Sequence, residues 1–127
     1  MVSHEQLNEI ADKYFGAIVA HDYDALEPLL SKNGVCNKDG QVYTFEVFRT
    51  ALEQVKEAVG DHVYEDAKRV IGANAIVEEH RGRTTDPARE GFDMWACVVL
   101  RTDDDGLIIQ MDEYLDSAAY NQTAQTD

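Results

Sequence analysis

Basic side chains, cysteines and long apolar runs are all scarce in this chain, and each shortage argues against a class of function. The 127 residues carry 11 Lys and Arg against 25 Asp and Glu, which gives a formal net charge of -14. A field of this sign repels phosphate backbones and anionic membrane surfaces, so we expect no nucleic-acid or membrane partner. The acidity is most simply explained by solubility. No stretch approaches the roughly 20 apolar residues that a membrane span needs.

The cysteines, Cys36 and Cys97, show neither the spacing of metal ligands nor the pattern of a disulfide framework. Residues 1–20 lack the basic start and apolar run of a signal peptide. We therefore expect a reducing, cytoplasmic location. No motif indicates a cofactor. We also expect no metal site, because Glu78 and Glu79 face opposite ways on a strand and residues 103–106 lack the ligand spacing of a calcium loop.

The first half of the chain carries three helical patterns. Apolar residues recur at helical spacing from about Ser3 to Ala20, where Ser3 and Gln6 have the spacing of a capping box. Asp24 can cap a short second helix, and Thr44 can cap a third helix that ends at Gly60. Residues 31–43 indicate turns around two short extended pieces. The stripes expected to face the core are Leu7, Ile10, Ala11, Tyr14, Phe15 and Ile18, then Leu26, Leu29 and Leu30, then Phe48, Ala51, Leu52, Val55 and Val59.

The second half of the chain changes to a period of two, which is typical of strands. Four strands separated by short turns are expected, at His62–Ile71, Ala75–Thr84, Phe92–Thr102 and Leu107–Asp116. Connections this short join antiparallel neighbours, so the strands should form a meander. The sequence therefore predicts an α+β fold, a cone-shaped barrel in which three N-terminal helices pack on a curved, mainly antiparallel sheet. Residues 1–116 form this single domain, and residues 117–127 form a polar tail that we expect to fray.

The alternation along each strand also assigns its faces. Two arginines suit the outer face of Ala75–Thr84, which leaves Glu78 and His80 pointing inward. A one-residue bulge would invert such an assignment. The inner faces of the last two strands should carry Phe92, Met94, Ala96, Val98 and Leu100, and Leu107, Ile109, Met111, Glu113 and Leu115.

Three segments resemble the nuclear transport factor 2-like superfamily and, within it, the SnoaL-like group. They are Tyr14-Phe15-Gly16-Ala17-Ile18, Ala20-His21-Asp22-Tyr23-Asp24-Ala25-Leu26, and Asp105-Gly106-Leu107-Ile108 followed by Glu113-Tyr114-Leu115-Asp116. The resemblance spans about Glu5 to Asp116 and implies a cone with one open end that forms a pocket. The superfamily includes ketosteroid isomerases, limonene epoxide hydrolases, polyketide cyclases, dehydratases and members that only bind or dimerise, so the fold alone does not fix the function.

Neither of two family catalytic sets is complete in this chain. Tyr14 falls at the tyrosine of the ketosteroid isomerases, but Lys38 stands at their base position and Val98 near their second oxyanion donor. Against the epoxide hydrolases, His80 and Gly82 stand where that family has an arginine and an aspartate, and Glu113 replaces the aspartate of the last strand. Residues that can act as acids or bases stand at some of these positions, but neither family's catalytic set is present as a whole.

The candidate catalytic residues are His80, Glu113 and Tyr14. We expect His80 and Glu113 to form an acid/base pair on adjacent strands, with Glu78 near them, and Tyr14 to donate to an oxyanion. An apolar wall would raise the pKa of an unpaired carboxyl group. The residues expected to line a ligand-binding pocket are Phe15, Tyr43, Leu52, Glu78, Met94, Val98 and Met111.

Two interpretations stay open at this point. In the first, the chain is a cofactor-independent enzyme that transfers protons on a small, largely apolar substrate, as in isomerisation, cyclisation, dehydration or water addition. In the second, His80 and Glu113 are a structural ion pair in a ligand-binding or dimerisation module. A homodimer is expected in either case, because the outer sheet face is more apolar than a solvated sheet should be. That face should carry Trp95, Cys97, Val99, Ile108 and Tyr114.

Overall fold

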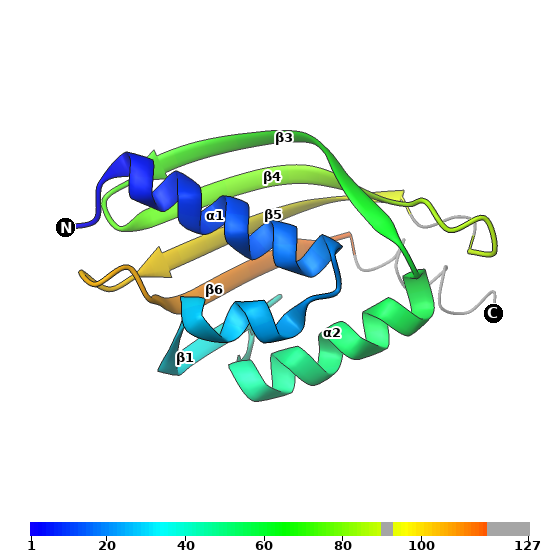
Figure 1. Cartoon of the computed structure of the whole chain (residues 1–127), viewed down its shortest axis with the longest axis horizontal. Coiled ribbons are helices and arrows are strands. Elements are labelled where there is room, and N and C mark those ends of the chain that lie inside the picture. The colour runs from blue at the N-terminus through cyan, green and yellow to red at the C-terminus, as the bar shows by residue number, and fades with distance from the viewer. Residues whose placement is uncertain (90–92, 117–127) are drawn as a thin grey trace.

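Helices and a single sheet make up the computed structural model, which describes residues 1–89 and 93–116. Phe92 and the tail from Ser117 to Asp127 lie outside the described residues. The elements follow in the order α1 (His4–Val19), the 3-10 helix η1 (Tyr23–Leu29), β1 (Leu30–Lys38), β2 (Gln41–Thr44), α2 (Phe45–Val59), β3 (His62–Gly72), β4 (Ala75–Thr84), β5 (Asp93–Thr102) and β6 (Ile108–Leu115). The three helices lie across one face of the curved sheet (Figure 1).

Local capping chemistry sets the ends of the long helices as predicted. Ser3 and Gln6 form a reciprocal capping box at the start of α1. The Thr44 hydroxyl accepts a hydrogen bond from the backbone N–H of Val47 at 3.2 Å, and Gly60 ends α2 with a φ of 69°. The caps therefore fix where each helix begins to cover the sheet.

The second helix differs from the prediction. It is a 3-10 helix that begins at Tyr23, and Asp24 lies inside it, where its carboxylate pairs with Arg49 at 2.5 Å instead of capping. Pro28 explains the difference, because it has no N–H to donate to the carbonyl of Asp24, as an α-helix would require. Leu30, expected in this helix, begins β1.

The sheet has six strands in the order β2-β1-β6-β5-β4-β3. The predicted meander is confirmed, since β3, β4, β5 and β6 are antiparallel neighbours in chain order. The two short extended pieces form an antiparallel pair, β1 and β2, and β1 adds to β6 in parallel. The sheet does not close on itself, because β2 and β3 are both edges. The architecture is thus α+β with a mainly antiparallel sheet.

Strand β6 contains a bulge that corrects part of the face assignment. Arg101 pairs with Gln110 while Thr102 pairs with Ile108, so Ile109 is an extra residue on β6. Leu107 and Ile109, predicted inside, are 36% and 41% exposed, whereas Ile108, predicted outside, is fully buried. Beyond the bulge the prediction is correct again, with Met111 in the core.

Strands β4 and β5 follow their predicted alternation. Ile76, Glu78 and His80 are buried on β4, and Met94, Val98 and Leu100 are buried on β5. Ile76, Val98 and Leu100 belong to the main core, which also contains Leu7, Ala11, Tyr14, Phe15 and Ile18 of α1. Met94 packs in a smaller cluster with Val59. Within residues 1–89 and 93–116, no helix has both the length and the apolar character that crossing a membrane requires.

Candidate active site

A cavity of about 390 Å³ lies between the helices and the inner face of the sheet. Its wall is mostly apolar, and its polar groups come from β1, β3, β4 and β6 as well as from the helices. The predicted lining residues Tyr14, Phe15, Tyr43, Leu52, His80, Met94, Val98 and Glu113 all contribute to the wall. A largely apolar cavity with a few polar groups is the usual form of a small-molecule site.

His80 and Glu78 form a buried pair on β4. Nδ1 of His80 lies 2.6 Å from a carboxylate oxygen of Glu78, and each residue is 2% exposed. Residues i and i+2 of a strand share a face, which brings the two side chains together. Because a carboxylate only accepts, Nδ1 carries the proton of this bond, and Nε2 is the ring nitrogen left for another partner.

Arg69 of β3 completes the environment of Glu78. Its Nε donates to the second carboxylate oxygen of Glu78 at 2.6 Å, and its Nη1 bonds to Asp12 of α1 at 2.6 Å. Burial alone would raise the pKa of Glu78, but the hydrogen bonds from His80 and Arg69 outweigh it and hold the pKa below its ordinary value. Glu78 is therefore a carboxylate at neutral pH. Glu78 was predicted to line the cavity, and this prediction was wrong: it stands behind His80 and is not part of the wall.

Aromatic rings hold the His80 imidazole in place. The Tyr64 ring stacks on it with centroids 3.9 Å apart and an interplanar angle of 15°, and the Phe15 ring meets it edge-on at 5.3 Å. Tyr64 pairs across the strands with Gly82, which also lines the cavity. Tyr64 was not among the predicted site residues, although a glycine in a strand, here Gly82, can mark a place where another group approaches closely.

Glu113 was predicted to pair with His80, and in the structure it does not. Strand β5 separates β4 from β6, and Val98 is the cross-strand neighbour of both Glu78 and Glu113. The prediction of a directly facing pair was wrong because the meander puts one strand between them. Burial raises the pKa of Glu113, and Asp39 adds to this effect, while Lys38 and His80 oppose it.

Tyr14 and Cys36 lie deep in the cavity wall. The Tyr14 hydroxyl donates to the sulfur of Met111, and a thioether is a weak acceptor. Met111 was predicted to line the cavity but stands behind its wall. Burial raises the pKa of Tyr14 well above its ordinary value. Burial also raises the pKa of Cys36 to about 12, so Cys36 stays a thiol, which is a poor nucleophile.

Several polar atoms on the wall have hydrogen-bonding capacity to spare. Among the described residues, nothing bonds to Nε2 of His80, to the Tyr64 hydroxyl or to the side-chain carboxyl of Glu113. Buried polar groups normally find partners, so polar atoms left over on an apolar wall are suited to a ligand. In residues 1–89 and 93–116 no cluster of His, Cys, Asp or Glu is arranged to hold a metal ion.

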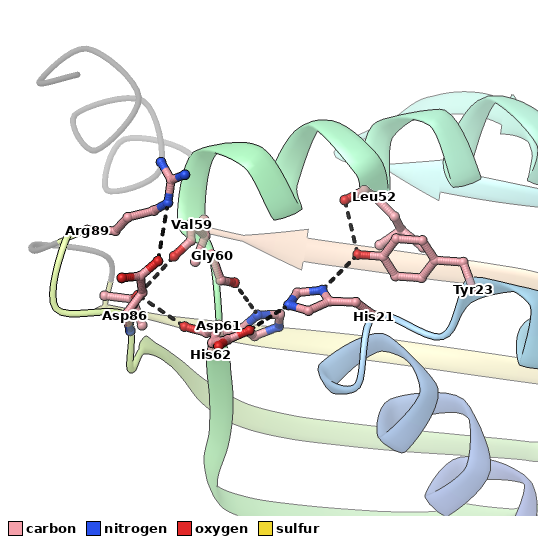
Figure 2. A network of polar contacts seen from close by, with 10 residues as sticks. His21, Tyr23, Leu52, Val59, Gly60, Asp61, His62, Asp86 and Arg89 are labelled. Atoms are coloured by element: carbon pink, nitrogen blue, oxygen red, sulfur yellow. Dashed lines mark hydrogen bonds and ion pairs between the residues drawn. The ribbon is translucent and has the colours of Figure 1, made fainter.

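A second polar cluster, also missed by the sequence analysis, lies where α1, η1, α2 and β3 meet (Figure 2). It contains His21, Tyr23, Asp61 and His62, of which Tyr23 and His62 line the cavity. Nδ1 of His21 lies 3.2 Å from the Tyr23 hydroxyl, which donates to the carbonyl of Leu52 at 3.2 Å.

Comparison with known proteins bears on the fold. No family model and no curated protein matches the chain. Among solved structures, AusH from Aspergillus nidulans superposes with a TM-score of 0.80 at 16% identity over 94% of this chain and 92% of that one. IdmH from Streptomyces antibioticus, a proposed polyketide cyclase, gives 0.79 at 13% identity over 94% and 99%. An LEH-like epoxide hydrolase from M. tuberculosis gives 0.71 at 16% identity over 97% and 92%.

The fold is the nuclear transport factor 2-like fold of the SnoaL-like proteins. TM-scores of 0.71 to 0.80 establish this fold, and identities of 13 to 18% carry no information on the reaction. Within this SnoaL-like cone, the groups that face the cavity are a histidine with a carboxylate behind it, a second carboxyl group and several tyrosines. This set can accept, donate and relay protons.

Proposed function

We propose that the cavity binds a small, largely apolar organic molecule and that His80 transfers a proton to or from it without a cofactor. The observation that carries this proposal is the Glu78–His80 pair, 2.6 Å apart, on the wall of an apolar cavity. A carboxylate bound to Nδ1 fixes the tautomer of the imidazole and stabilises the imidazolium form. Nε2 is then the atom that exchanges the proton.

The reaction has a simple balance of atoms and electrons. Nε2 of His80 takes a proton from a carbon next to a carbonyl group, and the electron pair of the broken C–H bond moves onto the carbonyl oxygen. The imidazolium returns the proton at another carbon in an isomerisation, or to a departing hydroxyl group in a dehydration. Each step needs only a base that becomes an acid, and general acid–base catalysis by such a group contributes typically ~10²–10⁴-fold.

Glu113 and Tyr14 would stabilise the oxygen that gains charge. The raised pKa of Glu113 favours its protonated form, which can donate a hydrogen bond to an enolate. Tyr14 is held by a thioether, and exchanging this weak acceptor for an oxyanion is favourable. Proteins of this fold include a proposed polyketide cyclase and an LEH-like epoxide hydrolase, which supports a small-molecule reaction in the cavity.

Hydrogen exchange in a probe ketone tests the proposal. The protein is incubated with 2-tetralone, an apolar bicyclic ketone, in D2O, and mass spectrometry follows deuterium incorporation next to the carbonyl group. We expect wild-type protein to accelerate exchange and His80→Gln to slow it by about 10²-fold or more. His4→Gln, which changes an exposed histidine, is the matched control and should exchange like the wild type.

A non-catalytic module is the second candidate. The observation that favours it is that Glu78 is bonded on both oxygens, by His80 and Arg69, and so ties β3, β4 and α1 together as a structural unit would. In this case no variant of His80 alters exchange. Removing one partner of a buried charged pair instead lowers the free energy of unfolding by about 3–5 kcal/mol.

The outer sheet face supports a homodimer as part of either function. Trp95 of β5 and Tyr114 of β6 are 54% and 49% exposed there. Exposed apolar patches of this kind commonly mark association sites. Sedimentation velocity should show a dimer for the wild type and a monomer for Trp95→Glu, while Val47→Glu on α2 leaves the dimer intact. A monomeric wild type would contradict this arrangement.

A further inference from the structure

His62 brings a second unused acceptor to the cavity. It begins β3, is 6% exposed and lines the cavity wall. Its Nδ1 lies 3.4 Å from the backbone carbonyl of Gly60, and since a carbonyl only accepts, Nδ1 carries a proton. Burial lowers the pKa of His62 more than its hydrogen bond to Gly60 raises it, which favours the neutral ring. In a neutral ring with a protonated Nδ1, Nε2 holds a lone pair.

Nothing in the described part of the chain bonds to this lone pair. His62 lines the cavity, and a polar atom that faces a cavity without a partner from the chain is available to a ligand. The cavity supplies the space for a partner that is not part of the chain. An acceptor in this position selects for a hydrogen-bond donor and disfavours a carbonyl or carboxylate oxygen, whose lone pairs would face that of Nε2.

The surroundings of His62 hold it firmly. Its ring contacts those of Tyr64 and His21, with centroids 5.2 Å and 5.7 Å away. Nδ1 of His21 contacts the Tyr23 hydroxyl, and the exposed carboxylate of Asp61 lies 3.3 Å from Nε2 of His21 without forming a hydrogen bond (Figure 2). Residues from β3, from the connection between α2 and β3 and from the connection after α1 thus contact this ring. Groups fixed before binding lose little freedom on binding, which favours recognition.

Tyr64 connects His62 to His80. Its ring stacks on that of His80 with centroids 3.9 Å apart and meets that of His62 edge-on with centroids 5.2 Å apart, and all three residues line the same cavity. His80 likewise has Nδ1 committed, to Glu78, and Nε2 free to accept. The cavity therefore presents two acceptors, on two imidazole rings that both contact Tyr64.

We propose that Nε2 of His62 is a second anchoring point of the cavity, which accepts a hydrogen bond from a hydroxyl group of the ligand. The ligand class is a largely apolar ring compound with two hydroxyl or enol groups, one facing His80 and the other facing His62, and its body lies along Tyr64. This inference rests on the proposed ligand-binding function of the cavity, and it adds the chemical group that sets specificity. Asp61, His21 and Tyr23 position the anchor and need not touch the ligand.

Two probes that differ in one donor test the inference. Isothermal titration calorimetry measures the binding of 2,6-dihydroxynaphthalene and of 6-methoxy-2-naphthol, which has the same ring frame but can donate at one end only. We expect the diol to bind wild-type protein up to about tenfold more tightly, as one neutral hydrogen bond allows. In His62→Phe, which keeps a ring in place, the two probes should bind within about twofold of each other. His4→Phe, an exposed control, should keep the preference.

Nitrogen resonances in the ¹⁵N-labelled wild type give a readout that does not depend on a variant folding. The Nε2 signals of both His62 and His80 should shift on adding the diol, which would support the inference. Equal affinity for the two probes, with a shift at His80 and none at His62, would overturn the anchoring role while leaving the proposed function standing. No shift at His80 with either probe would overturn the proposed function and this inference together.

Discussion

Glu78 and Glu113 stand on either side of Val98 on the same inner face of the sheet, yet their surroundings drive their pKa values in opposite directions. Glu78 has two cationic or hydrogen-bonding partners within 2.6 Å, and its pKa is lowered. Glu113 lines the cavity, where burial dominates, and its pKa is raised. Partners, more than depth, decide the charge of a buried carboxyl group. The contrast divides the site into a fixed anion behind His80 and an adaptable acid facing the ligand.

Among these variants, the one that removes Arg69 should cause the largest loss of stability, because Arg69 is one of the two partners that keep Glu78 charged. Arg69→Met leaves the buried Glu78 with one partner, and we expect a loss of about 3–5 kcal/mol in the free energy of unfolding at pH 7. Urea denaturation measures it. Arg49→Met removes an arginine whose ion pair with Asp24 is exposed, and it should leave the denaturation midpoint nearly unchanged. Equal midpoints for the two variants would show that Glu78 does not depend on Arg69.

The two glutamates should also give opposite dependences of stability on pH. Because the folded pKa of Glu78 lies below its ordinary 4.5, its contribution is present above pH 4.5 and is lost as the pH falls through the folded pKa. Because the folded pKa of Glu113 lies above 4.5, its contribution is complete below pH 4.5 and is lost as the pH rises through the folded pKa.

Amide substitutions separate these two contributions. Glu78→Gln should destabilise the protein at pH 7 and by less as the pH falls below 4.5. Glu113→Gln should match the wild type near pH 4 and exceed it at pH 8, by on the order of 1 kcal/mol for each unit of raised pKa. Denaturation midpoints between pH 3 and 8 measure both. The same slope for both variants would mean that the two carboxyl groups share one environment.

Lys38, which acts on the pKa of Glu113, offers the mildest of these tests. Lys38 lowers the pKa of Glu113, so Lys38→Met should move that pKa further upward and change the stability at pH 7 by no more than about 0.5 kcal/mol. The side-chain carbon resonance of Glu113 in a pH titration reports the shift. Lys32→Met, an exposed position on the same strand, is the control. A downward shift of the Glu113 pKa would contradict the arrangement.

Sequence periodicity predicted the parts of this molecule that local physics controls. The caps at Ser3 and Thr44, the meander and the inward orientation of Glu78 and His80 all follow from local rules of capping, turn length and alternation. The bulge at Ile109 does not, because one inserted residue leaves no mark in a run of apolar side chains.

The candidate site was predicted in part for the same reason. Tyr14, His80 and Glu113 do reach one cavity, since each depends only on the face of its own element. The partner of His80 was assigned to the wrong strand, although the i, i+2 spacing of Glu78 and His80 was visible in the sequence. Arg69 and Tyr64 were missed because their roles depend on the register between β3 and β4, which the sequence pattern leaves open.

Arg69 has a mechanical consequence as well as an electrostatic one. It bonds at the same time to Glu78 in the sheet and to the side chains of Asn8 and Asp12 on α1. Lifting α1 from the sheet would therefore break the ion pair with Asp12 or pull the guanidinium away from the carboxylate that orients His80. In ligand exchange, α1 should act as the fixed wall of the cone, and molecules should enter and leave past other parts of its rim.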